Sequence, residues 1–201
     1  MPGRGSEEMR VGGKAQDAPK NAAAYLEAFQ IIFEENKALI YSLSFRLLNN
    51  RQEAENLTQE VFLNAFKAYP YFRGESKVST WLYRIAVNLI NNELKRKKLK
   101  KFLSLDFLSE ESGRTPTIEP VHPRHGLSAE LERKEMERIV QRLIRSLPER
   151  QRTAITLQYY EGLAYEEISS AMEISHSSVE SLLFRAKQNL EKRLAPYLID
   201  T

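Results

Sequence analysis

Apolar side chains recur along most of this chain at steps of three and four residues, the spacing that places them on one face of an α-helix. Residues 22–50 and 52–69 predict two such helices, with Asn36 as a candidate break in the first and Asn49-Asn50 at its end. The buried faces comprise Tyr25, Phe29, Ile32, Phe33, Ile40, Leu43, Leu47 and Leu48 in the first helix, and Ala54, Leu57, Val61, Phe62, Ala65 and Phe66 in the second.

A third predicted helix spans residues 81–100 and changes character along its length. Pro70 and Gly74 bracket the loop before it, and Ser79 or Thr80 can cap its first turn. Its first part, TWLYRIAVNLINNEL, is amphipathic, whereas the run KRKKLKK at residues 95–101 has six basic residues in seven. The end of this helix is therefore expected to present positive charge on all sides.

Two segments break the periodicity. Residues 1–20 are rich in glycine and lack large apolar side chains, which is typical of a flexible tail. Residues 102–127 contain three prolines and predict a flexible linker between domains. Four further helices are expected at residues 128–146, 148–160, 165–172 and 176–194, and no segment alternates with period two. The prediction is an all-α fold with two small helical domains, at 21–101 and 128–195.

Composition narrows the function classes. The 201 residues contain no cysteine, which excludes disulfides, thiolate metal sites and a cysteine nucleophile. Neither a signal peptide nor a membrane span is predicted, so a cytoplasmic protein is expected. The net charge of +3 is unevenly distributed. Residues 21–101 carry 13 basic and 8 acidic side chains, the linker carries 2 and 4, and residues 128–195 carry 11 of each.

Enzyme chemistry is not predicted. The glycines do not lie between a strand and a helix, so neither a Rossmann loop nor a phosphate-binding loop is available. His122 and His125 are close in sequence, but they lie in the proline-rich segment without supporting carboxylates. We expect no catalytic residue, no metal site and no cofactor.

Residues 163–190 show a helix-turn-helix pattern, in which a short turn at 173–175 separates two amphipathic helices. Small polar residues open the second helix and would permit close approach to a DNA groove: His176, Ser177, Ser178 and Ser181. An αα-hairpin in a helical bundle would show a similar pattern. In the first domain, aromatic residues precede the basic run, a combination that suits single-stranded DNA because bases stack while phosphates meet cations. A solvated helix end and buried aromatic residues are the alternatives there.

Three segments together resemble the extracytoplasmic-function (ECF) sigma factors of the sigma-70 family. They are AENLTQEVFLNAF (54–66), FRGESKVSTWLYRIAVNLINNELKRK (72–97) and LPERQRTAITLQYYEGLAYEEISSAMEISHSSVESLLFRAKQNL (147–190). The resemblance implies that residues 21–101 form sigma region 2 and residues 128–195 form region 4. It also implies a role in promoter recognition and DNA melting, with core RNA polymerase (β′ clamp and β flap), promoter DNA and an anti-sigma factor as partners.

The resemblance assigns residues to each surface. Glu53, Asn56, Gln59 and Glu60 would dock on the β′ clamp helices, with Asn56 where the family usually has Asp. The minus-ten element would meet Tyr71, Phe72, Trp81, Tyr83, Asn88, Asn92, Lys95, Arg96, Lys97 and Lys98. The minus-thirty-five element would meet His176, Ser177, Ser178, Ser181, Arg185 and Lys187. Glu180 and Leu182 stand where many relatives have Arg or Lys, so weaker duplex binding is expected. A dimeric helix-turn-helix repressor remains the alternative function.

Overall fold

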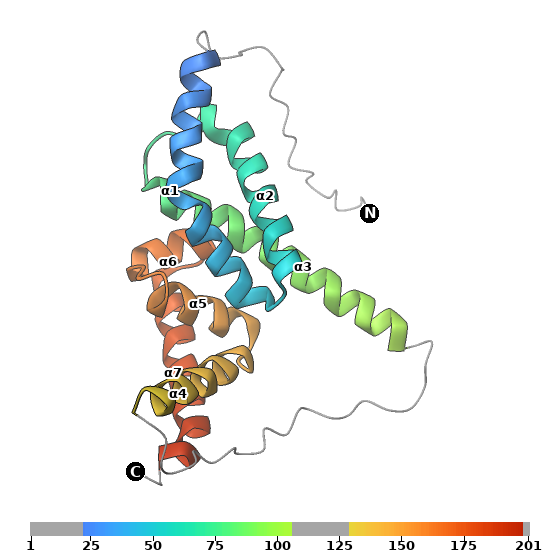
Figure 1. Ribbon diagram of the computed structural model, residues 1–201, viewed down its shortest axis with the longest axis vertical. Helices are drawn as coiled ribbons and strands as arrows, with labels where there is room; N and C mark the ends of the chain where they lie inside the picture. The colour runs from blue at the N-terminus through green and yellow to red at the C-terminus, as the bar shows by residue number, and fades with distance from the viewer. Residues whose placement is uncertain (1–21, 106–128, 199–201) are drawn as a thin grey trace, which may run out of the picture.

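A computed structural model describes residues 22–105 and 129–198, in which helices joined by short loops are present and no strand occurs. The N-terminal domain contains α1 (Ala22–Leu48), α2 (Arg51–Ala68), the 3₁₀ turn η1 (Tyr69–Tyr71) and α3 (Val78–Leu105). The helix-turn-helix domain contains α4 (Ala129–Arg145), α5 (Glu149–Tyr159), α6 (Tyr165–Met172) and α7 (His176–Leu198). The predicted all-α fold with two helical groups is confirmed (Figure 1).

The helix boundaries differ from the prediction in three places. The first helix continues through Asn36. The Asn36 side chain is buried, and its amide donates to the Ile32 carbonyl one turn earlier at 2.8 Å. The α3 helix begins at Val78 and continues to Leu105, into the first residues of the predicted 102–127 linker. The α7 helix continues past Pro196 to Leu198. The predicted tail, the rest of the linker and both linker histidines lie outside the described residues.

The core of the N-terminal domain forms where α1, α2 and α3 pack together. Ile40, Leu43, Val61, Leu82 and Ile90 are among its fully buried side chains. Asn50 caps α2, since its side-chain oxygen accepts from the Glu53 backbone N–H at 3.2 Å. The second half of α3 extends away from this bundle (Figure 1), which leaves its apolar residues Leu99, Phe102 and Leu103 exposed.

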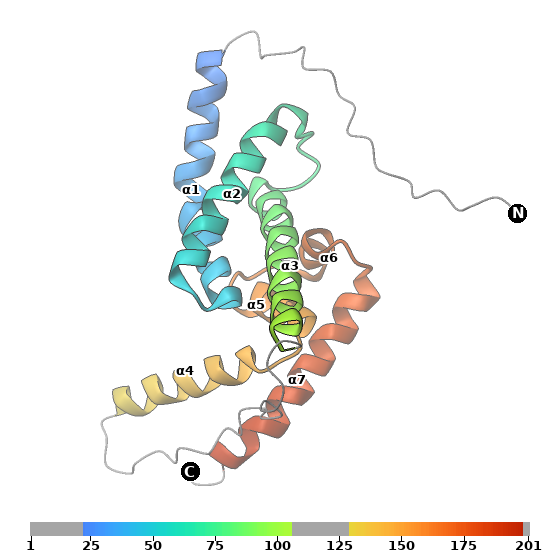
Figure 2. The same ribbon diagram turned by 90° about the vertical axis from the view of Figure 1, so that its right-hand side faces the viewer.

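The helix-turn-helix domain packs directly on the N-terminal domain. Helix α6 packs across α3, and α5 packs against α1, so that the buried residues of both domains form one continuous cluster. A second small cluster joins α4 to α7 through Ile139, Leu143 and Tyr197 at the far end of the molecule (Figure 2). The chain is therefore in a closed form, by which we mean the arrangement with these two domains in contact.

Candidate nucleic-acid interface

The loop before α3 and the start of α3 form an aromatic cavity of about 490 Å³. Tyr71 is 76% exposed, and Phe72 lies against Trp81 with ring centroids 4.8 Å apart. Arg73 and Arg84 line the same cavity. Aromatic faces beside guanidinium groups can stack a base while they attract its phosphate. Sequence reasoning missed both arginines, although their place beside Phe72 and one turn after Trp81 was a usable signal.

Two of the predicted aromatic contacts are covered in the closed form. Trp81 and Tyr83 are 6% and 3% exposed. The Tyr83 hydroxyl donates to Glu161 of the helix-turn-helix domain at 2.8 Å. Burial and the Glu161 carboxylate both raise the pKa of Tyr83. Because Glu161 covers its hydroxyl, Tyr83 can contact a base only in an arrangement where the helix-turn-helix domain is displaced from it.

Asn88 and Asn92 lie one turn apart on α3, but they face different surroundings. The Asn88 amide donates to the Glu173 carboxylate at 3.1 Å, across the domain boundary. Asn92 lines a groove between α2 and α3 together with Asn56, Glu60 and Arg96. The two amides therefore share one helix face without sharing a site in the closed form.

The cationic run on α3 is partly neutralised by carboxylates. Arg96 pairs with Glu93 at 2.7 Å, Lys97 pairs with Glu53 of α2, and Lys98 pairs with Glu149 at 3.0 Å. Lys95 is exposed and has no carboxylate partner in the described part of the chain. The first two pairs are within the N-terminal domain, whereas the Lys98 pair depends on the closed form.

Of the predicted polymerase-docking residues on α2, Glu53, Asn56 and Glu60 line the groove between α2 and α3, and Gln59 lies outside it. Asn56, Gln59 and Glu60 are exposed, and Glu53 is half-buried by its contact with Lys97. The Gln52 side-chain amide donates to Asn56 at 3.1 Å, so the Asn56 amide is already held in place. Leu63 follows Gln59 by one turn and is 61% exposed. Sequence reasoning missed this apolar side chain, although it lies outside the buried periodicity of α2.

The helix-turn-helix is built by a tight turn between α6 and α7. Glu173 ends α6 in a left-handed conformation with φ of 51°, and the Ile174 backbone N–H donates to the Ser169 carbonyl at 3.1 Å. The Ser178 backbone N–H donates to the Ser175 hydroxyl at 3.3 Å, which caps the start of α7. This turn holds the first residues of α7 at the surface.

Most of the predicted duplex-binding residues lie along one groove beside α7. Ser177, Ser178, Ser181 and Arg185 line it, and Arg150 from α5 lies opposite them. His176 lies beside it, within 3.4 Å of Glu166 and 3.6 Å of Glu180. Lys187 instead lies over the Tyr159 ring at 5.9 Å and does not line this groove.

Sequence reasoning also missed two residues of this surface. Arg150 approaches the groove only through the packing of α5 on α7, so no local pattern marks it. Phe184 is 63% exposed on α7, one turn after Ser181. Its departure from the buried positions Val179, Leu183 and Ala186 was the signal that could have found it.

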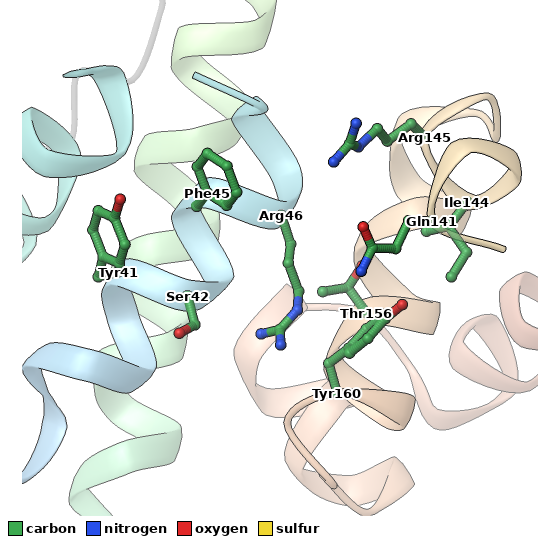
Figure 3. A pocket seen from close by; sticks show the side chains of 9 residues that line it. All are labelled: Tyr41, Ser42, Phe45, Arg46, Gln141, Ile144, Arg145, Thr156 and Tyr160. Atoms are coloured by element: carbon green, nitrogen blue, oxygen red, sulfur yellow. The ribbon is translucent and has the colours of Figure 1, made fainter. Parts of the chain in front are cut away.

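The boundary between the domains contains a buried polar cluster. The Glu161 side chain is only 2% exposed and accepts from Tyr83 and, at 3.2 Å, from Arg46. Burial raises the pKa of Glu161 above its ordinary value despite these two donors. Arg46 also lies over the Tyr160 ring at 4.4 Å. Figure 3 shows Arg46 and Arg145 directed toward a cavity of about 220 Å³ between α1, α4 and α5.

The described residues contain no group of His, Asp and Glu side chains arranged to hold a metal ion. None of the described helices has the length and apolar character that a membrane span requires.

Comparison with known proteins gives concordant results. Residues 32–100 match the family model for sigma-70 region 2, and residues 137–190 match that for sigma-70 region 4. The chain is 34% identical over 171 residues to the RNA polymerase sigma-H factor of Pseudomonas aeruginosa, covering 85% of this chain and 88% of the relative. It is 33% identical over 172 residues to the ECF RNA polymerase sigma-E factor of Haemophilus influenzae, covering 86% and 90%.

A solved structure has the same fold. The sigma factor RpoE of Bartonella quintana, crystallised with the anti-sigma factor NepR, aligns with a TM-score of 0.62 at 21% identity. This alignment covers 84% of the present chain and 98% of the crystallised one.

Proposed function

Because the chain belongs to the ECF sigma factors of the sigma-70 family, we propose that its two domains divide promoter recognition and polymerase docking between them. The protein is an RNA polymerase sigma factor that directs promoter recognition at the start of transcription. The N-terminal domain binds core polymerase and the unpaired minus-ten strand. The helix-turn-helix domain reads the minus-thirty-five element as duplex DNA.

The observation that carries this division is the aromatic cavity at the start of α3, the helix whose second half carries the basic run. Tyr71 and Phe72 offer ring faces for an unstacked base, buried Trp81 packs against Phe72, and Arg73 and Arg84 offer charge for the phosphate. Asn88 and Asn92 follow along α3, and each amide offers both a donor and an acceptor to a base edge. Together with Tyr83 and the basic residues at 95–98, we call this surface the strand-reading face.

Docking on polymerase is assigned to the exposed surface of α2, including its side of the groove with α3. Glu53, Asn56, Gln59 and Glu60 supply hydrogen-bonding groups for the β′ clamp, and exposed Leu63 supplies an apolar contact among them. Interfaces of this kind combine a small apolar centre with a polar rim. The Asn50 cap supports this surface because it holds the first turn of α2 in helical geometry.

Duplex recognition is assigned to the groove beside α7. Ser177 and Ser181 permit close approach to base edges, Arg150 and Arg185 offer charge to phosphates, and Phe184 offers an apolar contact to a thymine methyl group. His176 and Lys187 lie at the edges of this surface. Since residues 128–195 carry as many acidic as basic side chains, the affinity of this domain for duplex DNA depends on attachment to polymerase, which raises its effective concentration.

No catalytic role is assigned to the chain, because nucleotide addition belongs to polymerase. Its place of action is the bacterial cytoplasm, where polymerase and promoters meet. An anti-sigma factor is the expected negative regulator, as one binds the Bartonella relative.

The test is transcription in vitro with bacterial core polymerase on a library of genomic promoter fragments, with and without this protein. New start sites and a stable complex with core are expected. The variant Q59A/E60A should lose both the new start sites and the complex with core. The control variant E130K/E191K, which changes exposed residues of the other domain, should retain both. Binding to duplex operators by a dimer, without core, would instead support a repressor.

A further inference from the structure

The cavity of about 220 Å³ between α1, α4 and α5 lies apart from every surface assigned above. Phe45 and Arg46 of α1 line one side of it, and Arg145 of α4 and Tyr160 at the end of α5 line the other side (Figure 3). None of the described residues that line it belongs to the strand-reading face, the docking surface of α2 or the groove beside α7. The proposed function therefore leaves this cavity without a role.

The charge of the cavity is positive. Arg145 is exposed, and no residue in the described part of the chain pairs with its guanidinium group. Arg46 donates to Glu161 at 3.2 Å, which offsets its charge but leaves other N–H groups of the same guanidinium available. No described Asp or Glu lines the cavity itself. Two guanidinium groups without a facing carboxylate favour an anion, and their forked geometry suits a phosphate group.

Aromatic rings lie beside these guanidinium groups. The Phe45 ring is 39% exposed, and it stands nearly parallel to the Tyr41 ring, with an interplanar angle of 10° and ring centroids 6.2 Å apart. Arg46 already lies over the Tyr160 ring at 4.4 Å, so Phe45 offers the more accessible ring face. A simple inorganic anion makes no use of such a ring, whereas a nucleotide base stacks on it. The cavity therefore suits a ligand that joins a phosphate to an aromatic ring system.

The remaining polar groups and the size of the cavity narrow the ligand further. The Gln141 amide and the Tyr160 hydroxyl line the cavity, and neither has a hydrogen-bond partner among the described residues. An amide offers both a donor and an acceptor, which suits the edge of a base. The cavity is smaller than the roughly 300–1,000 Å³ of sites for drug-sized ligands, which favours one base and one phosphate over a dinucleotide.

We propose that this cavity binds a nucleoside monophosphate. Arg145 and Arg46 hold its phosphate, the Phe45 ring stacks on its base, and the Gln141 amide meets the edge of that base. The proposal goes beyond the proposed function, because the ligand is a free small molecule and its site shares no residue with the assigned DNA and polymerase surfaces. Since both domains line the cavity, the bound nucleotide adds contacts between α1 and α4 and stabilises the folded chain.

Two variants separate the phosphate contact from the ring contact. R145Q removes the uncompensated charge at an exposed position, and its matched control is R142Q, which changes an exposed arginine one turn earlier on α4 that does not line the cavity. F45A removes the ring face, and its matched control is F102A, which removes a ring that is 64% exposed on α3. Circular dichroism checks that every variant remains helical.

The experiment is isothermal titration calorimetry of the full-length chain with AMP, GMP, CMP and UMP, and with inorganic phosphate and the four unphosphorylated nucleosides. At least one nucleotide should bind with a stoichiometry of one, on the order of tenfold more tightly than phosphate or its own nucleoside. R145Q and F45A should each weaken this binding on the order of tenfold, while R142Q and F102A match the wild type. The same nucleotide at saturation should raise the thermal unfolding midpoint of the wild type and leave that of R145Q unchanged.

Three results would overturn the proposal. The first is that none of the four nucleotides binds to the wild type at millimolar concentration. The second is that inorganic phosphate binds as tightly as every nucleotide, because the ring would then contribute nothing. The third is equal nucleotide affinity in R145Q and R142Q, which would place the nucleotide elsewhere, such as on the strand-reading face. Transcription with core polymerase tests the proposed function separately, and new start sites without nucleotide binding would refute only this inference.

Discussion

The basic residues at positions 95–98 are expected to contribute unequally to the salt dependence of promoter binding. Arg96 and Lys97 keep their partners Glu93 and Glu53 when the domains separate, because both pairs are within the N-terminal domain. Lys98 loses Glu149 on opening, and Lys95 has no carboxylate partner in the described structure. The double variant K95A/K98A is therefore expected to remove two phosphate contacts, whereas R96A/K97A removes groups that are already paired with carboxylates.

The magnitude follows from counterion release. Each phosphate contact with single-stranded DNA contributes about 0.7 to the slope of log affinity against log salt, so K95A/K98A should flatten this slope by about 1.4. Between about 50 and about 200 mM salt, that change amounts to about a sevenfold difference in how strongly affinity falls. R96A/K97A should leave the slope close to that of the wild type.

The assay is equilibrium binding of a pre-melted promoter fragment in saturating core polymerase, measured by anisotropy at several potassium chloride concentrations. Core polymerase is kept saturating because R96A/K97A removes the partner of Glu53, a residue assigned to polymerase docking. Any change in polymerase affinity then does not alter the measured DNA-binding slope. An equal flattening of the slope in both double variants would refute the reasoning, since the internal ion pairs would then have no effect. A steeper or unchanged slope for K95A/K98A would place Lys95 and Lys98 outside the DNA interface.

Three other predictions concern stability, docking and pH. Leu82 is fully buried, and L82A is expected to lower the free energy of unfolding by about 2–5 kcal/mol in urea denaturation; a variant as stable as the wild type would show that this core collapses around the smaller side chain. N56D is expected to tighten binding to core polymerase in a titration, because it introduces a charge-assisted hydrogen bond; unchanged affinity would remove residue 56 from the interface. Burial raises the pKa of Glu161 in the closed form despite Tyr83 and Arg46, so the closed form binds a proton more readily than an open one. Closure should therefore be favoured near the ordinary value of 4.5 and weaken as pH rises through the raised pKa, measured by interdomain energy transfer; an E161Q variant with the same pH dependence would contradict this assignment.

The periodicity of the sequence was sufficient for the helices because helix formation depends on neighbours within a turn or two. It also placed the buried face of α2 correctly, since Leu57 and Val61 lie in the core. The ends of α3 were less accessible to this reasoning. No strong start signal marks Val78, and no stop signal follows Lys101 closely. The first glycine or proline after the basic run is Gly113.

The candidate site was predictable only in part. Motif resemblance indicated which helices carry the docking, strand-reading and duplex-reading residues, and these assignments remain predictions. It did not find Arg73, Arg84 or Arg150, because each becomes relevant only through the cavity or groove that packing creates around it. Nor did it separate Lys187 from the other duplex-reading residues, since the Tyr159 ring that it covers lies on another helix.

The sequence by itself determined an all-α chain of two domains, its cationic third helix and its membership of the sigma factors, because these depend on local periodicity and contiguous motifs. Only the tertiary structure decided that the helix-turn-helix domain lies on α3 and that Glu161 and Glu173 take the donors of Tyr83 and Asn88. Those partners are far apart in the chain, and nothing local links them. Their pairing follows from how α6 packs across α3, which places acids of a neutral domain against donors of a cationic one.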